Sequence, residues 1–282
     1  MSNRINTIVF SRDRAAQLKL FLDSVNKNAT GIFNLNVLYS YTDKDHQKGY
    51  EKLLDTYSDV NFIPEKVEFK EQVLELTKEG GDLFSFFLDD DIIYNKVSVD
   101  EITKEIEDED VVCFSLRLGE NTTKCYTLGT DNVMHDILKN GNIMKWDWSL
   151  HYLDFGYPFA MDGHIFRKSD IIKLVKKSTF SCVEELEMAL FDFAEMFPRN
   201  KMASYTQSAL VGVPVGRVQE SLDSEMAMAL KESRARLMRK EMNTVFLEGS
   251  FISLEEIDFS EVNGCHQDLD LGVELKKQEE NE

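Results

Sequence analysis

The sequence predicts an α/β protein in which a central, mostly parallel sheet is flanked by helices and continues into a mixed α+β portion. Short runs of β-branched and aromatic residues alternate with stretches whose apolar residues recur at helical spacing. Repeated strand–helix units of this length need crossover connections, and these build a parallel sheet with helices on its faces. Ligands of such proteins bind at the carboxyl ends of the strands.

The first part of the chain shows this alternation most clearly. A strand is predicted over 5–10, followed by a helix whose apolar residues from Leu18 to Val25 recur at helical spacing. The Gly80-Gly81 pair is a helix stop directly before another strand. The other strands and helices expected in this part are, in order, 37–41, 46–57, 60–63, 68–79, 83–89 and 111–116.

The second part is less regular. Residues 119–160 contain both tryptophans and many other aromatic residues between glycines and asparagines, so we expect functional loops there. Helices are predicted over 169–177, 184–197 and 223–243, and a frayed tail over 273–282.

Composition restricts the class of protein. With 43% hydrophobic and 29% charged residues the chain is globular and not mainly disordered. The formal charge of −19 repels phosphate backbones and anionic membranes, so a nucleic-acid partner is disfavoured unless a local basic patch, such as Arg234 to Lys240, offsets it. No membrane span or signal peptide is present, which predicts a cytoplasmic protein, and four scattered cysteines predict reduced thiols.

Three consecutive acids stand at the end of a strongly apolar strand. Phe86-Phe87-Leu88 drives this strand into the sheet, and Asp89, Asp90 and Asp91 follow at its carboxyl end. Neighbouring carboxylates repel one another unless a cation or hydrogen-bond donors offset the charge. Carboxylate oxygens suit Mg²⁺ or Mn²⁺, whose open positions accept phosphate oxygens. A solvated acidic turn that caps the next helix is the alternative interpretation.

Several motifs resemble one known family. The strand ending in SRDR, the DDD run, FAMDGHIFRKSD and VEELEMAL look like family-2-like nucleotide-sugar glycosyltransferases of the GT-A fold. SALVGVPVGRVQ, NTVFLEGS and NGCHQD resemble the VPVNRVQ, LNxxFLxG and NxxHQE motifs of a bacterial and viral subset, over about residues 5 to 270. Gly216 replaces the Asn and Asp268 the Glu of that pattern. The first strand lacks the standard GxGxxG and GxxxxGK phosphate loops.

The resemblance implies a divalent metal site. The last acid of the motif, Asp91, would ligate Mn²⁺ or Mg²⁺, while Asp89 or Asp90 would support the metal's waters or the ribose. His266 in NGCHQD would complete the ligands, and a neutral imidazole is an acceptable Mn²⁺ ligand. Without the motif, His266 reads as an ordinary loop residue.

Donor binding is expected beside the first two strands. Ser11 and Arg12 follow the first strand, where such enzymes hold the nucleotide, and Arg12 could pair with a phosphate. Tyr39 and Asp43 could contact the base, although a strand-end tyrosine is as often core. Arg217 in VPVGRVQ could contact the diphosphate or the acceptor.

A general base is expected among the acids of the second part. An inverting transfer needs a carboxylate that takes the proton of the acceptor hydroxyl. Glu187, with Glu184 as second candidate, lies where the family carries an acidic base motif, and their spacing of three puts both on one helix face. The same acids also suit the start of a helix. Asp162 or His164, on either side of Gly163, could bind sugar hydroxyls, whereas a plain turn would look similar.

Aromatic residues of the second part could also contact sugars. Trp146, Trp148, Tyr152 and Tyr157 suit stacking against sugar faces, although clustered aromatics also pack in cores.

The sequence thus predicts a metal-dependent glycosyltransferase. Residues 1–118 would form the nucleotide-sugar-binding half of one GT-A domain and residues 119–272 the acceptor-binding and catalytic half. The donor would be a nucleotide-diphosphate sugar, with a UDP-sugar favoured. The acceptor would be a carbohydrate or another hydroxyl, in the first place that of a polysaccharide or glycolipid, with a hydroxylated base in viral DNA as the minority alternative. A nucleotidyltransferase and a non-catalytic nucleotide-sugar or divalent-ion binding module are the alternatives.

Overall fold

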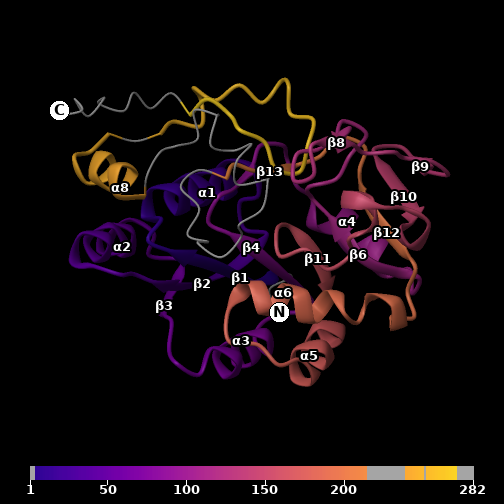
Figure 1. Cartoon of the computed structure of the whole chain (residues 1–282), viewed down its shortest axis with the longest axis horizontal. Helices are drawn as coiled ribbons and strands as arrows, with labels where there is room; N and C mark the ends of the chain where they lie inside the picture. Colours follow the sequence, from indigo (N-terminus) through magenta and orange to yellow (C-terminus); the bar gives the residue numbers. More distant parts are fainter. Residues whose placement is uncertain (1–3, 215–238, 251, 272–282) are drawn as a thin grey trace.

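The computed structural model describes residues 4–214, 239–250 and 252–271. One large sheet crosses this part of the chain (Figure 1). Its strands are β1 Ile5–Arg12, β2 Phe33–Ser40, β3 Asn61–Pro64, β4 Leu83–Leu88, β6 Val111–Ser115, β9 Leu138–Asn140, β10 Ile143–Asp147, β11 His164–Arg167 and β12 Lys201–Tyr205. Their order in the sheet is β3-β2-β1-β4-β11-β6-β12-β10-β9.

Most strands of this sheet point the same way. The pairs β3-β2, β2-β1, β1-β4 and β6-β12 are parallel, whereas β11 and β10 run opposite to their neighbours. The parallel part comes from the first half of the chain and the mixed part from both halves. The predicted α/β class, with a mostly parallel sheet and a mixed second portion, is therefore confirmed.

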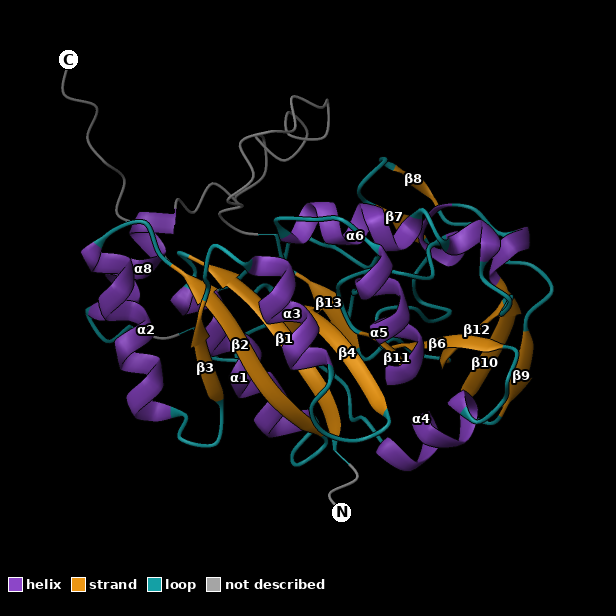
Figure 2. Cartoon of the chain, turned by 90° about the horizontal axis from the view of Figure 1, so that it is seen from below, coloured by secondary structure: helices purple, strands orange, loops and turns teal. Residues whose placement is uncertain are grey.

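Helices cover both faces of the sheet (Figure 2). The helices are α1 Ala15–Asn28, α2 Lys44–Thr56, α3 Phe69–Thr77, α4 Val99–Ile106, α5 Lys168–Lys177, α6 Val183–Phe191 and α8 Arg239–Leu247. One apolar core lies between the sheet and α1, α2, α4 and α8, and a second lies between the sheet and α3, α5 and α6. Alternate residues of β1 and β4 enter the two cores, as the period of a strand requires.

The parallel pairing of β1 with β4 fixes where the polar loops meet. Phe10 of β1 is the register partner of Leu88 of β4. Both strands then end at the same edge of the sheet, so Ser11 and Arg12 come beside the acids that follow Leu88. A separate two-stranded sheet at this edge consists of β5 Asp91–Ile93 and β13 Leu210–Gly212.

Several predicted elements differ in detail. The helix expected over 184–197 ends at Phe191 and is followed by the short 3-10 helix Ala194–Met196. The helix expected over 223–243 lies largely outside the described residues, which include only its end in α8. The tail predicted over 273–282 also lies outside them. Cys113, Cys125, Cys182 and Cys265 form no disulfide.

The tryptophans belong to the core and not to a sugar-binding surface. Trp146 is 2% exposed and Trp148 is 8% exposed. The indole of Trp146 donates to the carbonyl of Phe155, and that of Trp148 donates to the carbonyl of Arg199. Each indole ring is therefore buried, and its N–H group has a hydrogen-bond acceptor.

None of the described helices combines the length and the apolar character that a membrane-spanning helix requires.

The central position of Phe87 gives a test of this fold. Its side chain is fully buried, and its ring centroid lies 5.2 Å from those of Phe21 and Phe33. Phe87→Ala should lower the free energy of unfolding by about 3–5 kcal/mol, because it leaves a cavity beside two aromatic rings. Urea denaturation measures this, with the exposed Val67→Ala as control. A loss below about 1 kcal/mol would contradict the packing described for Phe87.

Candidate active site

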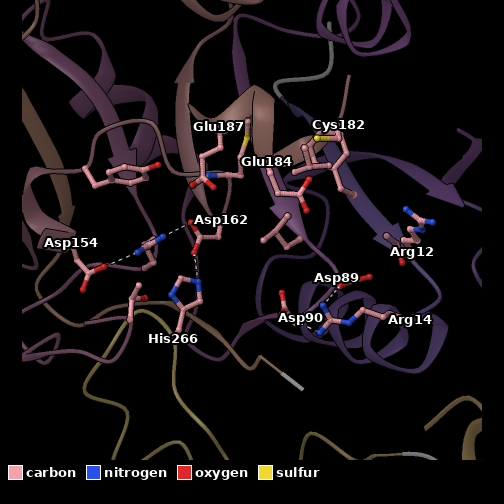
Figure 3. Close-up of a pocket in the computed structure, with 18 of the residues that line it drawn as sticks. Arg12, Arg14, Asp89, Asp90, Asp154, Asp162, Cys182, Glu184, Glu187 and His266 are labelled. Atoms are coloured by element: carbon pink, nitrogen blue, oxygen red, sulfur yellow. Dashed lines mark hydrogen bonds and ion pairs between the residues drawn. The ribbon is translucent and has the colours of Figure 1, made fainter. Parts of the chain in front are cut away.

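A cavity of about 590 Å³ opens at the edge of the sheet where β1 and β4 end (Figure 3). The two predicted halves of the chain both line it. Its polar and charged lining residues are Ser11, Arg12, Arg14, Glu65, Asp89, Asp90, Arg117, Cys125, Thr127, Asp154, Tyr157, Asp162, Cys182, Glu184, Glu187 and His266. Most of the predicted site residues therefore lie around one space.

Arg14 neutralises the first two acids of the DDD run. Its guanidinium lies 3.1 Å from Asp89 Oδ1 and 3.0 Å from Asp90 Oδ2, and all three side chains are buried. Burial alone would lower the pKa of Arg14, but Asp89 and Asp90 outweigh it and raise that pKa. Burial raises the pKa of Asp89 despite Arg14. Arg14 thus supplies part of the positive charge that the acidic run requires.

Asp91, the third acid of the run, makes other contacts than Asp89 and Asp90. It is 1% exposed, and its Oδ2 accepts a hydrogen bond from the amide of Leu88 at 2.9 Å. Its buried Oδ1 has no hydrogen-bond partner among the described residues. Burial, followed by the charges of Asp162 and Asp90, raises the pKa of Asp91 well above its usual range.

Gly212 brings Asp91 and His266 together. In β13 it pairs with Asp91 on one side and forms a bridge with His266 on the other. A Cβ at Gly212 would lie 2.6 Å from His266 Cδ2, 3.3 Å from His266 Nε2 and 3.6 Å from Asp91 Oδ1. The ring of His266 therefore packs directly on Gly212, close to the Asp91 carboxylate, in a position that a side chain at residue 212 would block.

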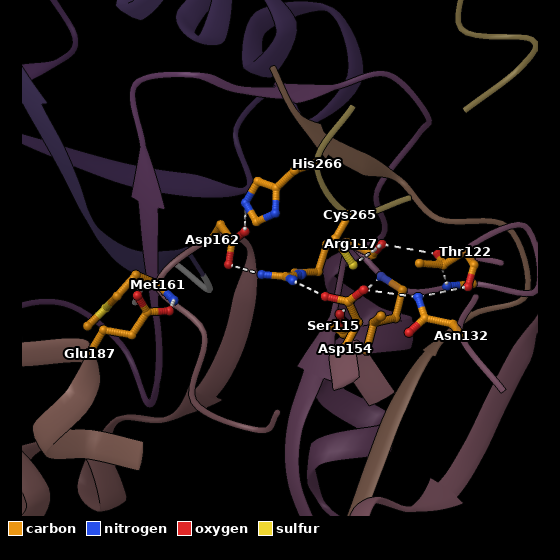
Figure 4. Close-up of polar contacts among 12 residues, drawn as sticks. Ser115, Arg117, Thr122, Asn132, Asp154, Met161, Asp162, Glu187, Cys265 and His266 are labelled. Carbon is orange, nitrogen blue, oxygen red and sulfur yellow. Dashed lines mark hydrogen bonds and ion pairs between the residues drawn. The ribbon is translucent and has the colours of Figure 1, made fainter. Parts of the chain in front are cut away.

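A chain of polar contacts connects His266 with the region after residue 119 (Figure 4). Asp162 Oδ2 lies 2.8 Å from His266 Nε2, and Asp162 Oδ1 accepts from Arg117 Nη1. Arg117 Nη2 donates to Asp154 Oδ1 at 2.9 Å, and Asp154 Oδ2 accepts from Asn132 at 2.9 Å. Burial would raise the pKa of Asp162, but Arg117 and His266 outweigh it and hold that pKa well below its usual range.

Among the described residues, Glu187 forms no ion pair with an arginine. Its Oε1 accepts a long hydrogen bond of 3.4 Å from the amide of Met161. Burial, followed by the nearby charge of Asp162, raises the pKa of Glu187 to about 7. Glu184, one turn earlier on α6, also lines the cavity but is exposed. A carboxylate that exchanges its proton near neutral pH suits proton transfer.

Some of the remaining predicted residues line the cavity, whereas others pack inside the fold or cap a helix. Ser11 and Arg12 line the cavity, and the Ser11 hydroxyl lies 2.7 Å from that of Tyr50. Tyr39 is buried against Tyr50, with ring centroids 4.7 Å apart, and does not line the cavity. Asp43 accepts from the amide of His46 and caps the start of α2. Arg217 lies outside the described residues.

Of the other predicted binding residues near Asp162, one lines the cavity and two do not. Burial, followed by the charge of Arg117, lowers the pKa of His164 to about 4, so this imidazole is neutral. His164 Nδ1 lies 3.2 Å from the carbonyl oxygen of Pro158, inside the core. Tyr157 lines the cavity and stacks on Phe191, whereas Tyr152 is 86% exposed and is not among the lining residues.

Four residues of this site escaped the sequence analysis: Arg14, Arg117, Asp154 and Gly212. Two of them carried usable signals. Arg117 directly follows the apolar run 111–116, at a strand end like the DDD acids. Gly212 interrupts an apolar strand, which is typical of a close approach to the backbone.

The donor atoms of Asp91 and His266 fit a divalent cation. The buried Oδ1 of Asp91 has no hydrogen-bond partner among the described residues and lies across Gly212 from the imidazole of His266. Within residues 4–214, 239–250 and 252–271, no group of three or more His, Cys, Asp or Glu side chains could hold a metal ion. A cation held by Asp91 and His266 would therefore need further ligands such as water or phosphate oxygens.

Comparison with known proteins gives one sequence relative. No protein-family model matches the chain. It is 28% identical over 193 residues to the bifunctional glycosyltransferase pgtA of Dictyostelium discoideum, a match that covers 61% of this chain and 25% of that protein. The chain therefore spans about a quarter of the length of this relative.

Solved glycosyltransferase structures are distantly similar. TarS of S. aureus is 16% identical with a TM-score of 0.47, over 73% of this chain and 36% of that chain. The mannosyltransferase PcManGT of Pyrobaculum calidifontis, solved with GDP-Man and Mn²⁺, is 14% identical with a TM-score of 0.31, over 42% and 40%. At these TM-scores neither structure defines the site of the present chain.

The raised pKa of Glu187 predicts how stability depends on pH. A glutamate in the unfolded chain titrates near pH ~4.3. Since the folded-state pKa is about 7, the native state holds a proton that the unfolded state has already released between these values, and stability falls as pH rises through this window. Glu187→Gln removes this contribution. Urea denaturation at pH 5 and pH 8 should show a smaller loss of stability in Glu187→Gln than in the wild type, and an equal loss would contradict a raised pKa of Glu187 in the folded protein.

Proposed function

We propose that this protein is a metal-dependent glycosyltransferase that moves a sugar from a nucleotide-diphosphate sugar, with a UDP-sugar favoured, to a carbohydrate hydroxyl. The observation that carries the proposal is one cavity lined by His266 and by a carboxylate, Glu187, with a pKa near neutrality. Asp91 is not among the residues that line this cavity but lies across Gly212 from His266, and we call these two residues the cation corner. The sequence likeness to a glycosyltransferase supports the same class.

The charge of the cavity supports metal dependence. Among the described residues, seven carboxylates and three guanidinium groups line it: Glu65, Asp89, Asp90, Asp154, Asp162, Glu184 and Glu187 against Arg12, Arg14 and Arg117. Arg14 and Arg117 already form ion pairs with buried acids. A diphosphate entering such an acidic cavity meets repulsion, which a divalent cation offsets.

The chain's own residues divide the binding of the donor between them. Asp91 and His266 would hold Mn²⁺ or Mg²⁺, which when bound neutralises charge on the leaving diphosphate. Arg12, at the end of β1, borders the cavity and is suited to pair with a phosphate oxygen. Asp89 stays beside the end of β1 through its ion pair with Arg14, where it can accept a ribose hydroxyl.

Glu187 is the best-placed base of the cavity. Asp162 is a poor base because Arg117 and His266 occupy its oxygens and hold its pKa low. Glu184 is the second candidate, but it is more exposed than Glu187. Glu187 faces the cavity, so an acceptor hydroxyl bound there could pass its proton to this carboxylate during transfer.

Replacing Asp91 tests whether the cation corner binds a divalent metal. Asp91→Ala should abolish Mn²⁺-dependent binding of UDP and reduce Mn²⁺-dependent hydrolysis of UDP-sugars by at least about 100-fold, since one protein ligand and a charge are lost. Calorimetry with UDP and Mn²⁺ measures binding. The exposed Asp59→Asn serves as control for loss of a carboxylate outside the cavity. Unchanged metal dependence in Asp91→Ala would show that the cation binds elsewhere.

Glu187→Gln tests the base and its pH dependence. The variant should bind UDP and Mn²⁺ normally but lose about 100-fold or more of the transfer rate, in the range that general base catalysis provides. In the wild type, kcat should fall about tenfold per pH unit below a midpoint near the folded-state pKa of about 7, because protonated Glu187 cannot accept a proton. Full transfer activity in Glu187→Gln would assign the base to another residue.

Product analysis separates the alternatives. Incubation with UDP-, GDP- and CMP-sugars and Mn²⁺ should yield nucleotide and free sugar slowly when no acceptor is present. Pyrophosphate as a product or substrate would favour a nucleotidyltransferase, and binding without turnover would favour a non-catalytic binding module.

A further inference from the structure

We propose that Arg117 is a positioning residue of this site, which fixes Asp162 and, through Asp162, the ring of His266 beside Asp91. The inference rests on the proposed function, because it concerns the residue that we place in the cation corner. Arg117 itself follows β6 and is 5% exposed.

The guanidinium of Arg117 is held between two fixed carboxylates. Nη1 donates to Asp162 and Nη2 to Asp154, which lie 45 and 37 positions later in the sequence. Asp154 is in turn held by Asn132 through its second oxygen. A planar guanidinium bound at two nitrogens has a defined orientation, which a flexible lysine cannot reproduce.

Through Asp162, Arg117 also restricts the orientation of the His266 ring. One oxygen of Asp162 contacts Arg117 and the other contacts His266 Nε2 at 2.8 Å, so the carboxylate cannot turn without losing a partner. The backbone of His266 is fixed by its bridge to Gly212, which leaves the ring rotation to be set by Asp162. A carboxylate at the ring nitrogen that does not bind the metal fixes the orientation of a metal-binding imidazole, so this contact would leave Nδ1 of His266 for the cation.

A second contact joins Arg117 to the same segment. The thiol of Cys265, the residue before His266, lies 3.7 Å from the carbonyl oxygen of Arg117, which accepts from it. The amide of Gly212 donates to the carbonyl of Cys265 at 2.8 Å. Arg117 therefore contacts the His266 segment through its main chain and, through Asp162, acts on the imidazole as well.

The experiment uses the full chain with Arg117→Lys and Arg117→Met. Arg117→Lys retains a positive charge for the two buried carboxylates, which protects the fold, but loses the planar fork. The affinity for Mn²⁺, with UDP as the probe nucleotide, is measured from the electron paramagnetic resonance signal of free Mn²⁺. We expect affinity to fall about 10–100-fold in both variants, as found when partners of metal-binding histidines are removed.

The matched control is Arg167→Met. Arg167 donates to the carbonyls of Val111 and Asp108 and does not line the cavity. Its loss should lower thermal stability and leave Mn²⁺ affinity unchanged. Wild-type Mn²⁺ affinity in a folded Arg117→Lys, or a failure of both Arg117 variants to fold, would overturn the positioning role.

A readout that needs no metal separates this inference from the proposed function. The ¹⁵N spectrum of the His266 ring, identified among the five histidines with His266→Gln, reports the hydrogen bond at Nε2. It should change in Arg117→Lys and not in Arg167→Met, and an unchanged spectrum would overturn the inference. If wild-type protein binds no Mn²⁺, the proposed function fails, while this spectrum still decides the role of Arg117.

Discussion

Pairing buried carboxylates with two buried arginines is the interaction on which the site depends. Arg14 bridges Asp89 and Asp90, and Arg117 bridges Asp154 and Asp162. Removing one partner of a buried ion pair typically costs about 3–5 kcal/mol, because it leaves an uncompensated charge. Whole domains are stable by only about 5–15 kcal/mol. The acids at this edge of the sheet are therefore held in place by the fold and are not a solvated acidic surface.

The same pairing separates the acids by their chemistry. Asp162 lies between Arg117 and His266, and its pKa is held low, whereas the neighbouring Glu187 lacks such partners and has a pKa of about 7. Part of the shift at Glu187 comes from the charge of Asp162 itself. Two neighbouring carboxylates with pKa values pushed apart are typical of acid–base sites, in which one group stays charged and the other moves a proton.

Sequence reasoning identified most of the acids of the cavity and Arg12, but it missed Arg14 and Arg117, which form ion pairs with these acids. The strand that ends in DDD, the strand–helix alternation and the motif around His266 are local patterns, so residue types and spacing reveal them. The Arg14–Asp90 and Arg117–Asp162 contacts join residues 76 and 45 positions apart, and only the strand order brings them together. Tyr39 shows the same limit, because its contact with Tyr50 depends on how α2 packs on the sheet.

The acidity of the cavity restricts what can enter it. The chain carries a formal charge of −19, and the described lining repeats this excess of acids at the site itself. An anionic donor is therefore expected to enter together with a cation and not as the free diphosphate. An acceptor that is itself a polyanion would add repulsion on the side of Glu184 and Glu187, whereas a neutral sugar hydroxyl adds none. The charge of the cavity thus favours a neutral carbohydrate over a nucleic acid as the acceptor.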